Sequence, residues 1–395
     1  RYHRSWRLRH FLCSRELSSR LRVRFPSLEG ESSLIQFHTI GYVLGQFLVA
    51  LAGTMLIPFA YGWVTGSGGL EPLAYSVAIT VGVGTLCLLL FRRPSKEVSQ
   101  REGLLLVVSI WLCVSLFGSL PFYLSPYFST FTDAFFESVS GFSTTGATVL
   151  EQVEVLPDAL QFWRCFSHWL GGMGIVLLGI AILPLVGHGG MQLYRAEFSG
   201  AKSERLKPRI TETAISLWKI YASLTVAQFI ALRLAGMNGF EAICHTFSTL
   251  GTGGFSTRTD SIGSFNSPLI EFVIIVFMLL AGISFIQHYR LWVERNPRLF
   301  FADVEVRYYL LIIVTSATLI AVILIWDNGN GVFLGARSAL FQVVSIVTTT
   351  GFVTENFEVW HPLPQVILLT LMFIGGCTGS TAGGMKTARV LLLTR

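Results

Sequence analysis

Three short stretches of the chain end an apolar segment at a glycine that is surrounded by Ser and Thr. They read FTDAFFESVSGFSTTGATV from Phe131, GFEAICHTFSTLGTGGFST from Gly239 and GARSALFQVVSIVTTTGFVT from Gly335. Carbonyl oxygens of an extended backbone can replace the hydration shell of a cation, and glycine allows the backbone angles that aim them inward. Hydroxyl groups of Thr and Ser add further oxygens. These stretches therefore predict a path for a dehydrated cation.

The helical part of each stretch is too short to cross a bilayer. A helix of about 10–14 residues covers about 15–21 Å, whereas the hydrocarbon core is about 30 Å thick. Unsatisfied backbone groups are costly in lipid, so the non-helical continuation must be buried in protein or line a watery path. We expect three re-entrant half-helices that converge on one axis. For any single copy, a kinked span or an irregular loop is the alternative, and the threefold recurrence argues against it.

Charges around the half-helices fit a cation as well. The C-terminal end of a helix carries partial negative charge and would point towards the centre. Asp133, Glu137 and Glu241 lie near the starts of the first two half-helices, where the positive dipole end favours acidic residues.

The rest of the chain has the composition of a membrane protein. Charged residues make up 13% of it, against roughly 25% in a soluble domain. Four runs of about 20 residues carry no charge, and three more carry one or two charged residues, which is too many for a signal peptide. The runs are 39–63, 72–91, 103–125, 308–326, 159–187, 213–235 and 269–287. We predict an all-α integral membrane protein.

The distribution of basic residues gives the topology. The chain has 29 Lys and Arg and a net charge of +6. All but Arg164, Arg233, Arg258 and Arg337 lie in five segments, which are 1–37, 92–101, 195–219, 290–307 and 386–395. By the positive-inside rule these segments, including the N-terminus, are cytoplasmic. Topology thus explains the basic charge, and no nucleic-acid partner is predicted.

One order of parts recurs along the chain: an apolar span, a half-helix, a Ser/Thr/Gly stretch, a second span and a basic loop. We predict a basic N-terminal segment at 1–37, a two-helix unit at 38–101, and pore repeats at 102–209, 210–304 and 305–395.

Together with HWLGGMGIVLLGIAILP from His168, GGMQLYRAE from Gly189 and IGGCTGSTAGGMK from Ile374, these stretches resemble the Trk, Ktr and HKT superfamily of potassium transporters. The likeness is closest to the bacterial TrkH type and covers about residues 39–395. It implies tandem M1–pore helix–M2 repeats arranged pseudo-symmetrically around a gated central pore, with two extra transmembrane helices in front. It also implies potassium as substrate, no bound cofactor and a bacterial inner-membrane location.

The resemblance implies one filter glycine per repeat, with two residues before it whose carbonyls also bind potassium. Glycine in all three repeats is the arrangement that prefers potassium over sodium. By motif, the filter residues are Thr144, Thr145, Gly146, Thr252, Gly253, Gly254, Thr349, Thr350 and Gly351.

The last apolar span is interrupted by GGCTGSTAGG from Gly375. The resemblance implies an intramembrane loop that gates permeation, with Gly375, Gly376, Gly379, Ser380, Gly383 and Gly384 as its residues. A plain packing kink is one alternative. A phosphate-binding loop is a weaker one, because Met385 stands where that motif needs Lys and no strand precedes it.

The filter glycines are 108 and 97 residues apart, so a fourth is expected near residue ~450. Arg395 is the last residue and the first is not Met. We therefore expect a fragment or an incomplete gene that lacks the fourth repeat, and three quarters of a filter ring should not conduct selectively.

Two other functions stay open. Broken helices also build the sites of coupled transporters, so a sodium- or proton-coupled potassium symporter is the main alternative. A membrane-embedded enzyme would need ionisable residues grouped at one depth. His168 is the best intramembrane candidate, but only Arg164 is near it in sequence, which favours a packing role. Six scattered cysteines suggest neither a zinc site nor a disulfide framework.

The resemblance also implies partners. Members of the family usually form a homodimer in the lipid bilayer on a cytoplasmic, nucleotide-binding (NAD/ATP) regulatory subunit of the TrkA type. The basic loops at 195–209, with Arg205, Lys207 and Arg209, and at 290–307 are where it could dock.

Overall fold

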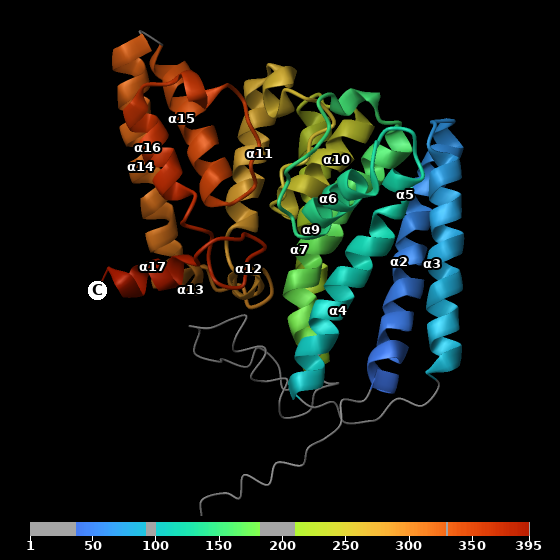
Figure 1. Cartoon of the computed structure of the whole chain (residues 1–395). Coiled ribbons are helices and arrows are strands. Elements are labelled where there is room, and N and C mark those ends of the chain that lie inside the picture. Colours follow the sequence, from blue (N-terminus) through green and yellow to red (C-terminus); the bar gives the residue numbers. More distant parts are fainter. Residues whose placement is uncertain (1–36, 92–99, 182–209, 329–330, 395) are drawn as a thin grey trace, which may run out of the picture. The chain divides into compact units, whose positions relative to one another are not determined.

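The structure is a computed structural model that describes residues 37–91, 100–181, 210–328 and 331–394 (Figure 1). Every regular element in these ranges is a helix, apart from an isolated bridge between Ile374 and Met385. The predicted all-α class is confirmed. Nearly all of the basic segment 1–37 and the whole docking loop predicted at 195–209 lie outside the described residues.

Two long helices open the described chain. Helix α2 (Phe37–Thr65) and helix α3 (Leu70–Leu90) pack along each other, as the blue pair in Figure 1 shows. Gly66 and Gly69 form the turn between them in the left-handed region, with φ of 68° and 85°. Both helices expose large apolar side chains such as Leu56 and Leu86, as helices that face lipid do.

One order of helices then occurs three times: a long helix, a short helix, a non-helical segment and a further helix. The first set is α4 (Gln100–Gly118) with α5 (Leu120–Tyr123), α6 (Phe131–Phe142) and α7 (Asp158–Ala181). The second is α9 (Ile210–Leu234), α10 (Gly239–Leu250), α11 (Pro268–Ala281) and α12 (Phe285–Trp292). The third is α14 (Val304–Asn328), α15 (Val332–Val347), α16 (Pro362–Leu371) and α17 (Thr387–Leu393). Helix α13 (Pro297–Ala302) joins the second set to the third, and the 3₁₀ turns η1 (Val153–Val155), η3 (Ser261–Phe265) and η4 (Phe357–Val359) follow the non-helical segments.

Two of the three short helices, α6 and α10, begin with side-chain caps. Helices α6 and α10 have 12 residues each. Thr130 and Asp133 form a capping box at the start of α6, and Asn238 accepts the Glu241 N–H at the start of α10. Asp133 and Glu241 therefore lie in the first turns of their helices, as the sequence predicted.

Five helices in the described ranges are long and apolar enough to cross a membrane, and they match runs predicted from the sequence. They are Phe37–Thr65, Leu70–Leu90, Glu102–Tyr123, Ala214–Leu234 and Val304–Trp326. The first half of helix α7 is surrounded by other parts of the protein, because every residue from Ala159 to His168 is buried. A Cβ on Gly171 of this helix would lie 2.1 Å from the Phe142 carbonyl oxygen, so α7 passes directly against the end of α6.

The run at 269–287 is not one straight span, contrary to the sequence prediction. Helices α11 and α12 are bent by 100° at the break between Ala281 and Phe285. The backbone groups freed there find partners in the loop that interrupts the last span. Cys377 N–H donates to the Gly282 carbonyl (2.8 Å), and Phe285 N–H donates to the Gly379 carbonyl (3.0 Å). A break at this depth is tolerated because these hydrogen bonds satisfy it.

Candidate functional site

The three half-helices α6, α10 and α15 end in the same unusual backbone turn. Thr144, Thr252 and Thr349 adopt left-handed conformations, with φ of 55°, 54° and 55°. Two residues later, Gly146, Gly254 and Gly351 have φ of 78°, 79° and 83°. A β-branched residue in the left-handed region is strained by about 1–3 kcal/mol. The same strain at three equivalent positions marks the turn as a functional feature.

Hydrogen bonds at the helix ends hold these threonines in place. In each turn, the N–H after the left-handed threonine donates back to the carbonyl of a serine five residues earlier: Ser140, Ser248 or Ser345, each at 2.9 Å. This is a Schellman motif in which threonine replaces the usual glycine. The sequence signalled the filter glycines but not the left-handed threonines.

The non-helical segments that follow lie against one another in chain order. A Cβ on Gly146 would lie 1.8 Å from the carbonyl oxygen of Gly253, and a Cβ on Gly254 would lie 2.0 Å from that of Thr350. Only glycine fits where a neighbouring backbone approaches this closely. A Cβ on Gly351 would meet no described atom within 4 Å. The structure thus brings the three predicted filter segments together.

These segments present backbone oxygens that the rest of the chain does not use. Within the described residues, no hydrogen bond ends on the carbonyl of any of the nine residues predicted for the filter. They are Thr144, Thr145, Gly146, Thr252, Gly253, Gly254, Thr349, Thr350 and Gly351. Thr252, Gly253 and Thr350 are buried. Because buried carbonyls in proteins are almost always paired, free ones at these residues fit a ligand that accepts lone pairs, such as a cation.

The predicted gate loop lies between α16 and α17 and closes on itself. Gly375 N–H donates to the Met385 carbonyl (2.9 Å), and the Gly375 and Gly376 carbonyls accept Thr387 Oγ1–H (2.8 Å) and Thr387 N–H (3.1 Å). The Ser380 hydroxyl donates to the Cys377 carbonyl (2.6 Å). Residues 375–382 are buried, and Gly379 and Gly384 have φ of 77° and 68°. This is an ordered excursion of the chain rather than a packing kink.

Three contacts fix the loop to its surroundings. It satisfies the break between α11 and α12, as described above. Its Gly383 N–H donates to the Thr349 hydroxyl (2.7 Å), which belongs to the third filter turn. Its Thr378 donates both N–H (2.6 Å) and hydroxyl (3.0 Å) to one oxygen of Glu305 in α14, which also accepts Ala388 N–H (3.2 Å). The N–H groups of Cys377, Thr378 and Gly383 are thus all engaged within the protein.

Comparison with known proteins identifies the family of the chain. Residues 73–395 match a family model described as TrkH, a cation transport protein. The chain belongs to this TrkH family. The resemblance expected from the filter motifs is confirmed, and a family of cation transporters argues against the membrane-embedded enzyme.

Individual relatives agree. The chain is 42% identical over 355 residues to the Trk system potassium uptake protein TrkH of Halomonas elongata, covering 89% of this chain and 74% of that one. It is 41% identical over 362 residues to the Trk system potassium uptake protein TrkH of Escherichia coli K12, covering 91% and 75%. The crystal structure of the potassium transporter TrkH from Vibrio parahaemolyticus superposes with a TM-score of 0.82 at 39% identity, covering 91% and 74%.

A buried ion pair braces the first two filter segments of this TrkH-family chain. Glu137 Oε1 lies 2.5 Å from Arg164 Nε, and both side chains are almost completely buried. Glu137 also accepts the Thr148 hydroxyl (2.9 Å), whereas Arg164 donates to the Ser256 carbonyl (2.9 Å) and lies over the Phe255 ring. The expectation that Glu137 sits at a helix start was wrong, because it lies in the middle of α6 and serves this pair.

One further ion pair lies within the second repeat, and another joins the second repeat to the third. Arg258 Nε lies 2.7 Å from Glu241, and Arg337 Nε lies 3.1 Å from Glu271. Three of the four arginines outside the basic segments are thus paired with acids. Their exception to the positive-inside pattern was a signal that the sequence analysis noted and did not use.

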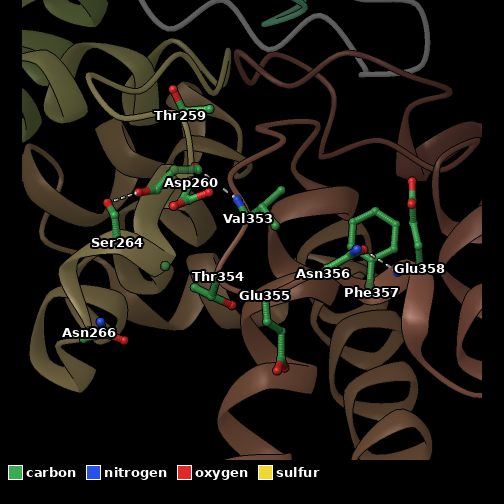
Figure 2. Close-up of a pocket in the computed structure, with 12 residues that line it drawn as sticks. Thr259, Asp260, Ser264, Asn266, Val353, Thr354, Glu355, Asn356, Phe357 and Glu358 are labelled. Atoms are coloured by element: carbon green, nitrogen blue, oxygen red, sulfur yellow. Dashed lines mark hydrogen bonds between the residues drawn. The ribbon is translucent and has the colours of Figure 1, made fainter. Parts of the chain in front are cut away.

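A cavity of about 640 Å³ lies between the segments that follow the second and third filter turns (Figure 2). Val353 links its two walls, since its N–H donates to the Ser261 hydroxyl (3.2 Å) and its carbonyl accepts Gly263 N–H (3.1 Å). Asp260, Glu355 and Glu358 give the lining a negative character. In this TrkH-family chain the cavity is therefore an acidic pocket lined by the segments that follow the second and third filter glycines.

Proposed function

We propose that this chain moves potassium across the bacterial inner membrane through a gated pore, as the membrane subunit of a Trk-type uptake system. Potassium binds to backbone carbonyls of the three filter segments, and potassium is a substrate rather than a bound cofactor. The observation that carries the proposal is a set of nine carbonyl oxygens that accept no hydrogen bond from the described residues, on three backbone segments that contact one another in chain order. Relatives named as potassium uptake proteins support the choice of ion.

The chemistry follows from the turn. Potassium has to leave water to pass, and an ordered set of carbonyl oxygens replaces its hydration shell. The left-handed threonine and the glycine two residues later fix the backbone of each segment. Moving the carbonyl oxygens inward to coordinate a smaller ion such as sodium would strain the Schellman turns. The half-helices add partial negative charge at their C-terminal ends.

Uptake of radioactive rubidium by a bacterial strain without potassium uptake systems of its own tests the proposal. We expect the protein with a complete ring of filter segments to restore growth at low external potassium and to take up rubidium, and Gly254→Ala to abolish both. Uptake that is no faster than in the empty strain would contradict the proposal.

Potassium flux into proteoliposomes separates a channel from a symporter. In proteoliposomes, an imposed sodium or proton gradient should leave potassium flux unchanged, apart from its effect on membrane voltage. Potassium that accumulates against its own electrochemical gradient when a sodium or proton gradient is imposed would establish the coupled alternative.

The loop at 375–384 is the gate in this proposal. It bonds to the filter turn at Thr349 and to the break at Gly282, so it occupies the position next to the filter where an obstacle would stop permeation. Opening then requires these hydrogen bonds to break.

The partners and the orientation complete the proposal. Two copies of the chain form a homodimer in the bilayer, and a cytoplasmic nucleotide-binding subunit of the TrkA type regulates the gate. The N-terminus is cytoplasmic, on the side of the basic segments. Neutralising Arg205, Lys207 and Arg209 together should weaken binding of that subunit in a pull-down, and unchanged binding would rule out this docking loop.

A further inference from the structure

The second filter segment differs from the first and the third in its side chains. In the first, the hydroxyls of Ser143 and Thr145 are hydrogen-bonded at 2.8 Å, and in the third the same pair is formed by Thr348 and Thr350, also at 2.8 Å. The corresponding positions of the second segment are both glycine, at 251 and 253. A brace made of two hydroxyls is therefore missing from this segment of the described chain.

His168 of α7 occupies the space of the missing side chains. A Cβ on Gly253 would lie 2.4 Å from Nδ1 of His168, and a Cβ on Gly251 would lie 2.4 Å from its carbonyl oxygen. The imidazole stacks on the ring of Phe255, with centroids 4.0 Å apart and planes 16° apart. His168 is completely buried. The two glycines and the histidine are thus complementary in shape.

The imidazole also takes over a hydrogen-bonding role. Ser140 donates its hydroxyl to the Ala147 carbonyl (2.6 Å) and Ser345 donates to the Phe352 carbonyl (2.7 Å), so in these repeats serine holds the residue after the filter glycine. In the second repeat the equivalent Ser248 hydroxyl lies 3.4 Å from His168 Nδ1 instead.

The residue after the second filter glycine is held through its N–H. Phe255 N–H donates to His168 Nδ1 at 3.4 Å. Since an N–H group can only donate, Nδ1 must be the acceptor, and the ring proton of the neutral imidazole lies on Nε2. Nε2 has no hydrogen-bond partner among the described residues. Protonating Nδ1 would turn the acceptor into a donor and break this contact.

From these contacts we propose that His168 is a positioning residue of the ion filter, which sets the place of the Thr252, Gly253 and Gly254 carbonyls and so contributes to the preference for potassium over sodium. His168 fixes the backbone of the second segment, as a pair of hydroxyl groups and a serine fix the backbone in the first and third repeats. The inference goes beyond a packing role, and it rests on the proposed function of the filter.

Selectivity separates this role from simple packing. The intact protein is compared with His168→Asn, whose Oδ1 can accept from Phe255 N–H, and with His168→Phe, which keeps an aromatic ring without an acceptor. Rubidium uptake is measured in competition with potassium and with sodium. We expect His168→Phe to lower the potassium-over-sodium preference about tenfold, and His168→Asn to keep it within about threefold.

His288→Phe serves as the matched control. This histidine of α12 is also buried and its Nε2 contacts the Leu280 carbonyl (2.8 Å), but it contacts none of the nine filter residues. Its potassium-over-sodium preference should equal that of the unmodified protein. A His168→Phe protein with unchanged preference would overturn the inference, whereas an unmodified protein that takes up no rubidium would contradict the proposed function instead.

A second measurement does not depend on transport. If the imidazole fills the space of a threonine side chain, Gly253→Thr should destabilise the protein strongly when His168 is present and much less in the His168→Ala background. Unfolding temperatures of the four purified proteins in detergent form the double-mutant cycle. Equal effects of Gly253→Thr in both backgrounds would overturn the assignment of this space to His168.

Discussion

The backbone N–H of Gly383 donates a 2.7 Å hydrogen bond to the hydroxyl of Thr349. Gly383 belongs to the loop that interrupts the last span, and Thr349 is the strained left-handed residue of the third filter turn. Filter and loop are therefore hydrogen-bonded to each other directly. If the loop is the gate, as proposed, any movement that opens the pore has to break this bond and release the side chain of Thr349 at the same moment.

Thr349→Val should make the pore easier to open. Valine keeps the shape of threonine but cannot accept the Gly383 N–H, and the loss of one hydrogen bond costs about 0.5–1.5 kcal/mol. We expect rubidium flux through proteoliposomes to rise about two- to tenfold. Thr349→Ser keeps the hydroxyl and is the control. If flux through Thr349→Val were the same as through Thr349→Ser, this bond would have no part in gating.

Glu305→Gln should release the loop from its other side. One carboxylate oxygen accepts three donors, two from Thr378 and one from Ala388, and hydrogen bonds to a charged acceptor are roughly twice as strong as those to a neutral one. A weakening of about 1–2 kcal/mol predicts a rise in flux of roughly five- to thirtyfold in the same assay. Glu294→Gln changes an exposed carboxylate after α12 and should have no effect. A Glu305→Gln protein with normal or reduced flux would show that the carboxylate does not restrain the loop.

The buried pair of Glu137 and Arg164 should behave as a unit. Removing one partner leaves an uncompensated buried charge, so Glu137→Gln and Arg164→Met should each lower the free energy of unfolding by about 3–5 kcal/mol. The double variant should recover most of this loss, because no lone charge remains. Thermal unfolding in detergent measures all three, with the exposed Glu151→Gln as control. Additive losses in the double variant would mean that the two side chains act independently.

Gly254→Ala should stop transport. The added methyl group would lie 2.0 Å from the Thr350 carbonyl oxygen, so the second and third filter segments would have to separate. Gly66→Ala is the matched control, since Gly66 also has positive φ (68°) but a Cβ there meets no described atom within 4 Å. It should cost only about 1 kcal/mol of backbone strain and leave rubidium uptake intact. Normal uptake by Gly254→Ala would refute close contact between the segments.

Local sequence patterns predicted those parts of the structure that depend on residues close together in the chain. The half-helices could be predicted from short apolar segments that are followed by Ser, Thr and Gly, and the interruption at Gly375 from small polar residues inside an apolar run. The left-handed conformation of Thr144, Thr252 and Thr349 was not predicted, because it depends on hydrogen bonds to the helix ends and not on residue type.

Contacts between residues far apart in the chain were not predicted, for a different reason. Glu305 meets Thr378 across 73 residues and His168 meets Ser248 across 80 residues, and one sequence holds no information on such pairs. The bend between α11 and α12 belongs to the same class. Gly282 and Ser284 permit it, but the hydrogen bonds that stabilise it come from the loop about 95 residues further on.

Binding of an electron-dense potassium substitute tests the central claim most directly. The purified, intact protein is crystallised in rubidium or thallium salts, and anomalous difference density is calculated. The account predicts peaks within coordination distance of the carbonyls of Thr144 to Gly146, Thr252 to Gly254 and Thr349 to Gly351, which diminish when sodium replaces the heavy ion. Bound ions found only elsewhere, with these carbonyls turned away from them, would contradict it.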